Sequence, residues 1–159
     1  MYINGEETYL YSPFELKRWT TEEVEKEYYE LKKRYNPDAV APSQHADNID
    51  TLSQIQYLFG EMAARCEKEY ALEKLQVEYD EATILKTLRK SWNEKESGKA
   101  PAIDVFKAEA RVACKDKWKR VFDLEEETSK FKSAYKSYGE RINALKYKIN
   151  ASKLEIGVQ

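Results

Sequence analysis

The chain holds few of the side chains on which enzyme active sites depend. Its single histidine is His45, its two cysteines are Cys66 and Cys114, and it contains neither a glycine-rich phosphate loop nor a Gly-x-Ser-x-Gly motif. An acyl-transfer triad built on histidine is therefore excluded. The carboxylates of Glu125–Glu127 fall on an expected helix surface, where no concave pocket would enclose them. We expect a protein that is not an enzyme and that uses no cofactor or metal ion.

Positively charged side chains gather around a polar turn near residue 97. Cations at the tip of a helical hairpin, with an aromatic ring nearby, suit the sugar-phosphate backbone of a single-stranded nucleic acid. The nucleic-acid-binding residues that we predict are Lys86, Arg89, Lys90, Lys95, Lys99, Lys107 and Arg111. Trp92 lies among them but continues an apolar stripe, so we favour a core role for it. Acidic residues are interleaved with the cations, and a solvated helix surface is the alternative interpretation.

The composition indicates long helices. Of the 159 residues, 42% are hydrophobic and 35% are charged, whereas the chain contains only 5 glycines and 4 prolines. Turns are therefore scarce, which excludes sandwiches and barrels of many short strands. Residues 1–85 carry nine Lys and Arg against eighteen Asp and Glu, a net charge of −9, and residues 86–159 carry eighteen against eleven, a net charge of +7. Such a polarised chain can present a basic surface to a polyanion.

Neither a secretory signal nor a membrane span is expected. The first residues lack a cationic segment followed by an apolar run, and no stretch approaches the ~20 apolar residues of a transmembrane helix. The two cysteines have neither the number nor the spacing of a disulfide framework or a zinc site, so we interpret them as small buried apolar residues. We expect a protein of the cytoplasm, that of the host cell if a phage encodes it, with no membrane partner.

The first 47 residues are expected to form a small region of their own. Asn4-Gly5 predicts a β-hairpin over residues 1–11, because this pair tolerates the positive φ angles of a type I′ turn. Thr20 and Glu23 have the spacing of a capping box and predict a short helix that ends at Asn36-Pro37. Its apolar face consists of Val24, Tyr28, Leu31 and Tyr35. Residues 38–47 show no apolar periodicity and are expected to be a linker.

Two long helices should follow, over residues 48–93 and from about residue 102 to 156. The first has an apolar stripe of Leu52, Ile55, Phe59, Met62 and Cys66 that resumes, after a phase break at residues 69–73, through Leu75, Tyr79, Ala82, Leu85 and Trp92. The second has a stripe of Ile103, Phe106, Ala110, Cys114, Trp118, Val121, Leu124, Phe131, Tyr135, Tyr138, Ile142, Leu145 and Ile149. From Phe131 onward its steps alternate between four and three, as in coiled coils.

The short turn between the two helices predicts an antiparallel hairpin. Residue i then lies opposite residue 195 minus i, roughly, which puts Cys66 near Ser129 and Cys114 near Glu81, too far apart for a disulfide. The predicted fold is therefore all-α: a long antiparallel, coiled-coil-like helical hairpin preceded by a small β-hairpin and a short helix. We divide the chain into residues 1–47 and residues 48–159, and expect the second part to oligomerise and to bind nucleic acid.

A second apolar stripe lies near the C-terminus. Its members, which we predict to form an oligomer interface, are Ala144, Tyr147, Ala151, Leu154 and Val158. This stripe lies almost opposite the one that contains Ile142 and Leu145, and one partner helix cannot bury both. We favour self-association; the alternative is that the N-terminal hairpin and short helix fold back over the second stripe.

The short N-terminal helix is the expected face for a protein partner. It carries Tyr28, Tyr29 and Tyr35, and tyrosines bury a large area at a small cost in conformational entropy. The basic run of residues 32–34 leaves a second DNA contact as the alternative.

Residues 48–159 resemble the UvsY family of phage recombination mediators. The similar strings are Ile84-Leu85-Lys86-Thr87-Leu88-Arg89, in the place of that family's basic DNA-contacting segment, and Lys107-Ala108-Glu109-Ala110-Arg111-Val112. The resemblance implies a homo-oligomer that binds single-stranded DNA and helps to load a RecA-type recombinase in exchange for a single-strand-binding protein. By position, Lys86 and Arg89 would contact the DNA. The other class of function is a non-enzymatic coiled-coil structural or interaction protein, such as a phage scaffold or an inhibitor of a host factor.

Overall fold

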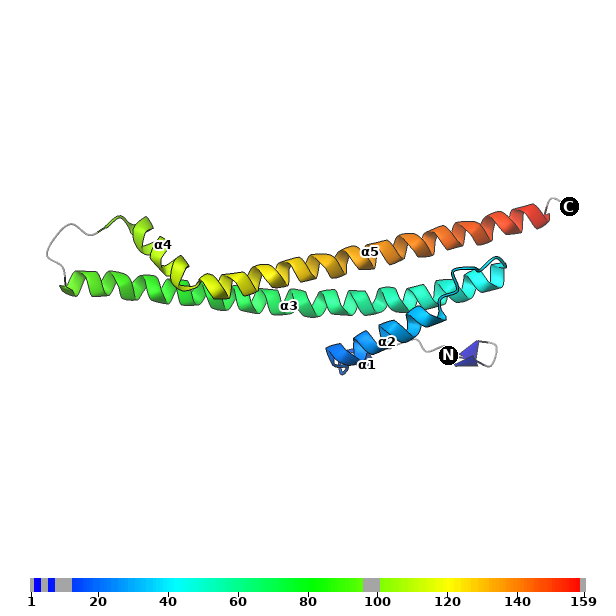
Figure 1. Ribbon diagram of the computed structural model, residues 1–159, viewed down its shortest axis with the longest axis horizontal. Helices are drawn as coiled ribbons and strands as arrows, with labels where there is room; N and C mark the ends of the chain where they lie inside the picture. Colours follow the sequence, from blue (N-terminus) through cyan, green and yellow to red (C-terminus); the bar gives the residue numbers. More distant parts are fainter. Residues whose placement is uncertain (1, 4–5, 8–12, 96–100, 158–159) are drawn as a thin grey trace. The chain divides into compact units, whose positions relative to one another are not determined.

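The computed structural model describes residues 2–3, 6–7, 13–95 and 101–157, and this part of the chain is all-α apart from two short strands (Figure 1). Strands β1 (Tyr2–Ile3) and β2 (Glu6–Glu7) pair in antiparallel fashion. The Asn4-Gly5 turn lies outside the described residues, so the hairpin over residues 1–11 stays a prediction. Within the described ranges, no helix is both long enough and apolar enough to cross a membrane.

The N-terminal helices follow the local sequence signals. After the single turn of α1 (Pro13–Leu16), helix α2 (Thr21–Arg34) begins with the predicted capping box. The side chain of Thr20 accepts a hydrogen bond from the Glu23 N–H at 3.2 Å, and the Glu23 carboxylate accepts one from the Thr20 N–H at 2.6 Å. Val24 and Leu31 are buried on the predicted apolar face. The helix ends before the proline, as expected.

Helix α3 (Pro42–Lys95) starts earlier than the sequence suggested. The prediction of a linker that lasts to residue 47 is wrong, because Pro42 occupies a first helical turn, where its missing N–H costs nothing. The Gln44 side chain caps this turn by accepting hydrogen bonds from the N–H groups of Val40 and Ala41, both at 3.0 Å. The connector between α2 and α3 therefore comprises only residues 35–41, and the Gln44 side chain fixes its last two residues.

The side-chain amide of Asn48 fixes this connector to α3. Asn48 is buried, and its side chain accepts a hydrogen bond from the Asn36 N–H at 2.9 Å while donating one to the Asn36 carbonyl at 2.7 Å. Both polar backbone groups of one loop residue are thus satisfied by a single side chain.

The chain divides into two compact units. Unit 1 comprises Met1–Ala64 and Ser129–Gln159, and unit 2 comprises Arg65–Thr128. Helix α3, with 54 residues, and helix α5 (Lys115–Gly157), with 43 residues, each contribute to both units, whereas α4 (Ile103–Ala113) belongs to unit 2.

In unit 1, α1, α2, the first part of α3 and the last part of α5 surround one apolar core. Its buried members are Leu16, Val24, Leu31, Leu52, Ile55, Leu58, Met62, Ile142 and Leu145. The Phe59 ring stacks on Tyr138, with centroids 5.4 Å apart, and meets the edge of Tyr28 at 5.4 Å. The Gln56 amide donates a hydrogen bond to the Tyr135 carbonyl at 3.1 Å, which places α3 and α5 antiparallel at close to the predicted register.

Two glycines of unit 1, one on α3 and one on α5, lie close to side chains of the opposite helix. A Cβ atom built on Gly60 would lie 3.2 Å from ring carbons of Tyr135, and one built on Gly139 would lie 2.7 Å from the side-chain nitrogen of Gln56. A larger residue at either position would force the opposite side chain to move.

In unit 2, the buried stripe of α3 differs from the predicted one. The core contains Val77, Cys114, Trp118 and Val121. Leu75 and Tyr79, which we expected to be in the core, are 66% and 68% exposed. The predicted phase break at residues 69–73 does not occur: α3 continues as one regular helix, so the inward positions after Cys66 keep their phase and reach Val77 rather than Leu75.

The predicted last helix is interrupted at Cys114, where α4 ends and α5 begins (Figure 1). Cys114 has φ −97° and ψ 10°, and its N–H is shared between the carbonyls of Ala110 and Arg111. Phe106, Ala110, Cys114 and Trp118 are all buried although each step is four residues. An unbroken α-helix would rotate such a stripe by about 40° a step, and the interruption keeps all four side chains buried.

Both cysteines are free and buried, as expected. Burial, followed by the charge of Glu127, raises the pKa of the Cys66 thiol. Glu127 lies close to the predicted partner position of Cys66, Ser129.

Candidate nucleic-acid interface

The end of α3 presents three of the predicted cations on one face, which we call the α3 basic face: Lys86, Arg89 and Lys90. All three are exposed, and they line a shallow hollow together with Ala82, Leu85 and Asn93. Their spacing of three and four residues places them on neighbouring turns. Among the described residues, neither Lys86 nor Arg89 forms an ion pair, so their charges are available to an external anion.

The two cations of α4 lie close by but are already engaged. Arg111 pairs with Glu81 at 3.3 Å, and its guanidinium stacks 3.6 Å from the ring centre of Trp118. The Trp118 indole donates a hydrogen bond to Glu81 as well, at 2.5 Å. Lys107 pairs with Asp104 on its own helix at 3.5 Å. Arg111 therefore holds α4 and α5 to α3 and has fewer donors left for a phosphate.

A second hollow connects these cations to the α3 basic face. It is lined by Glu78, Glu81, Ala82, Leu85, Lys107, Ala108 and Arg111. Ala82 and Leu85 line both hollows, so the predicted proximity of the α3 and α4 cations is present in the structure. Lys95 is the last residue of α3, and Lys99 lies outside the described residues.

Trp92 packs against another aromatic ring of unit 2 but is not a member of its buried core cluster, so the core role that we favoured for it stays a prediction. It is half-buried and meets the edge of the Phe106 ring, with centroids 6.3 Å apart. Unit 2 exposes other aromatic rings: Phe122, 54% exposed and 5.9 Å from Trp118, and Tyr79, 68% exposed. The sequence analysis did not identify Phe122 as an exposed aromatic residue. Its position one turn after Trp118 and off the apolar stripe was the signal that could have indicated this.

Ion pairs inside unit 2 neutralise part of the opposite charge carried by the two halves of the chain. Lys117 pairs with Asp80, and Arg120 pairs with Glu69, in addition to the pair between Arg111 and Glu81. The hydrogen bond from Lys117 lowers the pKa of Asp80, and the same contact raises the pKa of Lys117. Each pair joins an acidic residue of the first half to a basic residue of the second. The opposite net charges of the two halves therefore serve the packing of the helices as well as any surface.

The predicted oligomer interface is exposed on α5. Tyr147 is 75% and Leu154 72% exposed, and Ala144 and Ala151 are exposed between them, whereas Val158 lies outside the described residues. The alternative was that the N-terminal hairpin and the short helix cover this stripe. The short helix does not, because α2 packs in the core cluster that contains Ile142 and Leu145, and the hairpin over residues 1–11 lies largely outside the described residues. The C-terminal stripe, as we call Ala144, Tyr147, Ala151 and Leu154, is thus available to another molecule.

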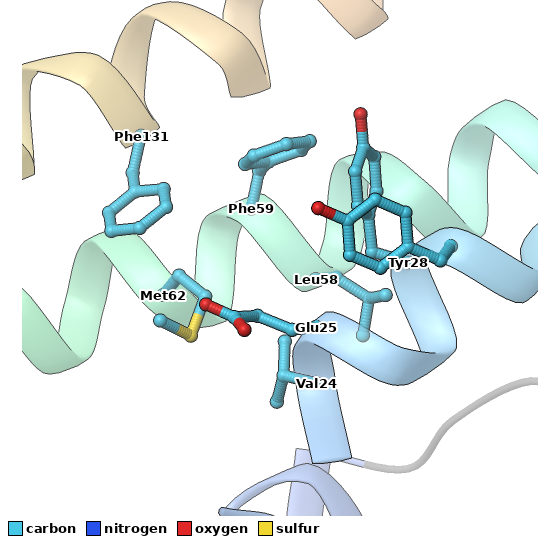
Figure 2. Close-up of a pocket in the computed structure, with 8 residues that line it drawn as sticks. Val24, Glu25, Tyr28, Leu58, Phe59, Met62 and Phe131 are labelled. Atoms are coloured by element: carbon cyan, nitrogen blue, oxygen red, sulfur yellow. The ribbon is translucent and has the colours of Figure 1, made fainter. Parts of the chain in front are cut away.

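The tyrosines of α2 are mostly internal. Tyr28 packs against Phe59, and the guanidinium of Arg141 lies 5.1 Å from the ring centre of Tyr35, so of the three predicted partner residues Tyr29 is the exposed one, at 59%. Beside it, α2, α3 and Phe131 of α5 enclose an apolar pocket of about 230 Å³ (Figure 2). Its lining residues are Val24, Glu25, Tyr28, Tyr29, Leu58, Phe59, Met62 and Phe131. Such a lining suits an apolar group and contains no nucleophile paired with a base.

In the part of the chain that the structure describes, no cluster of three histidine, cysteine or acidic side chains could hold a metal ion. Comparison of the chain with family models, curated proteins and solved structures gives no match.

Proposed function

We propose that this chain is a non-enzymatic recombination mediator that binds single-stranded DNA as a homo-oligomer and helps to load a RecA-type recombinase in exchange for a single-strand-binding protein. The observation that carries the DNA-binding part is the α3 basic face, three exposed cations on adjacent helical turns. The partner proteins follow from the resemblance of residues 48–159 to the UvsY family, in which Lys86 and Arg89 take the place of DNA-contacting residues.

The proposed binding is electrostatic and independent of sequence. The side chains of the α3 basic face suit phosphates, and the face lacks the amide and carboxylate groups, apart from Asn93, that would read base edges. One subunit offers few phosphate contacts, so useful affinity requires several subunits on one strand. Self-association through the C-terminal stripe would provide them.

The test is fluorescence anisotropy with a labelled oligothymidine at several salt concentrations. Each phosphate contact on a single strand contributes about 0.7 to the slope of log affinity against log salt, so replacing Lys86, Arg89 and Lys90 with Ala should lower the magnitude of the slope by about 2 for each subunit that engages the strand. The matched control replaces Lys26, Lys119 and Lys136, three exposed lysines elsewhere, and loses the same net charge. Equal losses in both triple variants, or binding that does not depend on salt, would contradict the proposal.

A structural or interaction protein is the second candidate, and a different observation favours it. Leu72 and Leu75 on α3 are 59% and 66% exposed in a chain whose other leucines on that helix are mostly covered. Such a surface is typical of a docking helix. If the wild-type protein forms a defined assembly but has no measurable affinity for single-stranded DNA at low salt, this second function is the correct one.

A further inference from the structure

Two helical segments expose large apolar side chains at heptad spacing. The first, which we call the α3 stripe, consists of Leu72, Leu75, Tyr79 and Ala82, whose three largest members are 59%, 66% and 68% exposed. The second is the C-terminal stripe on α5. Both stripes step by three, four and three residues, which is the pattern that one helix offers to another in a coiled coil. Neither is covered by the described residues of its own chain.

The two stripes are complementary in size when they pair in parallel. With residue i of the α3 stripe opposite residue i + 72, the layers are Leu72 with Ala144, Leu75 with Tyr147, Tyr79 with Ala151 and Ala82 with Leu154. Three of these four layers set a large side chain against alanine, the arrangement that lets facing side chains interdigitate. Pairing the C-terminal stripe with a copy of itself in parallel would instead place Tyr147 against Tyr147 and leave alanine against alanine.

The segments that carry the stripes are also opposite in charge. Residues 67–81 of α3 contain six acidic and two basic side chains, a net charge of −4, and residues 141–154 of α5 contain four basic side chains and no acidic one, a net charge of +4. Arg120, Lys117 and Arg111 pair with three of those acidic side chains, Glu69, Asp80 and Glu81, so the α3 segment together with these three cations keeps a net charge of −1. Like charges would oppose the pairing of two identical segments, whereas opposite charges favour contact between the different ones. Charge therefore selects the α3 stripe as the partner, since size alone would also allow the C-terminal stripe to pair with itself in antiparallel fashion, with Tyr147 against Ala151 and Leu154 against Ala144.

We propose that the C-terminal stripe of one copy docks, in parallel, on the α3 stripe of a second copy. The proposal rests on the homo-oligomer of the proposed function and specifies how it is built. Because the two surfaces differ, the contact is head-to-tail, and successive contacts close into a ring or continue as an open chain. Each contact spans only about three helical turns, so the assembly depends on every subunit using both surfaces.

The first test uses two single variants and their mixture in sedimentation velocity at micromolar concentration. Leu75→Lys and Tyr147→Glu should each weaken self-association by at least about tenfold, since each places a charge in an apolar interface. An equimolar mixture should associate again, because each variant retains one intact stripe and the two altered stripes meet as a Lys and Glu pair. If Leu75→Lys assembles like the wild type while Tyr147→Glu does not, the C-terminal stripe pairs with itself and the proposal is wrong.

The second test fixes the register. A chain that carries both Leu75→Lys and Tyr147→Glu should recover association, because these positions share a layer in the parallel arrangement. A chain with Tyr79→Lys and Tyr147→Glu should not; recovery by this second pair alone would overturn the parallel register. The folding control is the circular dichroism of each variant. The surface control is Val112→Glu, which alters a residue 72% exposed on α4, outside both stripes, and should leave association unchanged.

Failure of this inference can be distinguished from failure of the proposed function. Wild-type protein that remains monomeric removes both the docking contact and the multimeric DNA binding. If the protein assembles and its DNA affinity depends on the α3 basic face, but Leu75→Lys changes neither, only the docking contact is wrong.

Discussion

Glu81 holds unit 2 together through two different partners, and its replacement separates their contributions. It accepts a hydrogen bond from the Trp118 indole at 2.5 Å and pairs with Arg111 at 3.3 Å and 3.4 Å. Trp118 is 9% exposed, so its N–H without an acceptor would cost about 1–3 kcal/mol. The Arg111 side chain is 51% exposed, and solvent limits its ion pair to about 0.5 kcal/mol. The indole bond therefore dominates.

Two substitutions at this position should differ accordingly. Glu81→Leu keeps a similar volume but removes the acceptor, and we expect it to lower the free energy of unfolding by about 2 kcal/mol. Glu81→Gln keeps a side-chain oxygen for the indole and loses only the charge, so we expect a loss of about 0.5 kcal/mol. The matched control is Glu78→Leu, an exposed position one turn away, with a change within about 0.5 kcal/mol.

The assay is urea unfolding followed by circular dichroism, with near-ultraviolet signals reporting on the tryptophans. A loss of about 2 kcal/mol corresponds to a fall in Tm of roughly 4–8 °C for a chain of this length. The reasoning fails if Glu81→Leu and Glu81→Gln lower stability equally, or if Glu81→Leu does no more than the Glu78 control. Either result would mean that the indole bond does not dominate the contribution of Glu81 to stability.

Two further predictions concern unit 1. Burial, together with a hydrogen bond to Tyr28, raises the pKa of Tyr138 to about 12. The stability that its neutral form contributes should therefore be complete below pH 10 and be lost as the pH rises through 12. In an alkaline titration followed by phenolate absorbance, Tyr138→Phe should remove a component that ionises near pH 12. Replacement of Asn48 with Ala should cost about 1–3 kcal/mol in thermal or urea unfolding, because the Asn36 N–H loses its acceptor and the Asn36 carbonyl keeps only the longer bond from the Ala39 N–H at 3.4 Å. An unchanged stability would show that water replaces the amide without loss.

Features that depend on neighbouring residues were predictable. The capping box of Thr20 and Glu23 needs only a spacing of three residues, and the burial of Leu52, Ile55 and Met62 follows from one uninterrupted helical period. Antiparallel pairing followed from the shortness of the turn, and contacts such as that of Gln56 with Tyr135 lie near the predicted register. In each case a local rule determines the result.

Features that depend on tertiary contacts were not predictable. No residue near Cys114 signals the end of a helix. The interruption allows four side chains spaced four residues apart to be buried together, and this depends on the packing of unit 2 rather than on the local sequence. Which side of α3 is buried after Cys66 depends on whether the helix stays regular. The sequence alone allowed either Leu75 or Val77 to face the core. The engagement of Arg111 by Glu81 and Trp118 requires the register of three helices, so seven predicted cations appeared equivalent until their neighbours were known.

The usual rule for helix stabilisation does not apply unchanged to the two glycines of unit 1 that face side chains of the opposite helix. Replacing glycine with alanine in a helix interior normally adds about 1 kcal/mol. At Gly139, the new methyl group would displace the Gln56 amide and break its bond to the Tyr135 carbonyl, whereas at Gly60 it would press on the Tyr135 ring, which is 46% exposed and free to yield. Gly139 is therefore the stricter of the two, because there the gain in helix propensity is offset by the loss of a hydrogen bond between α3 and α5.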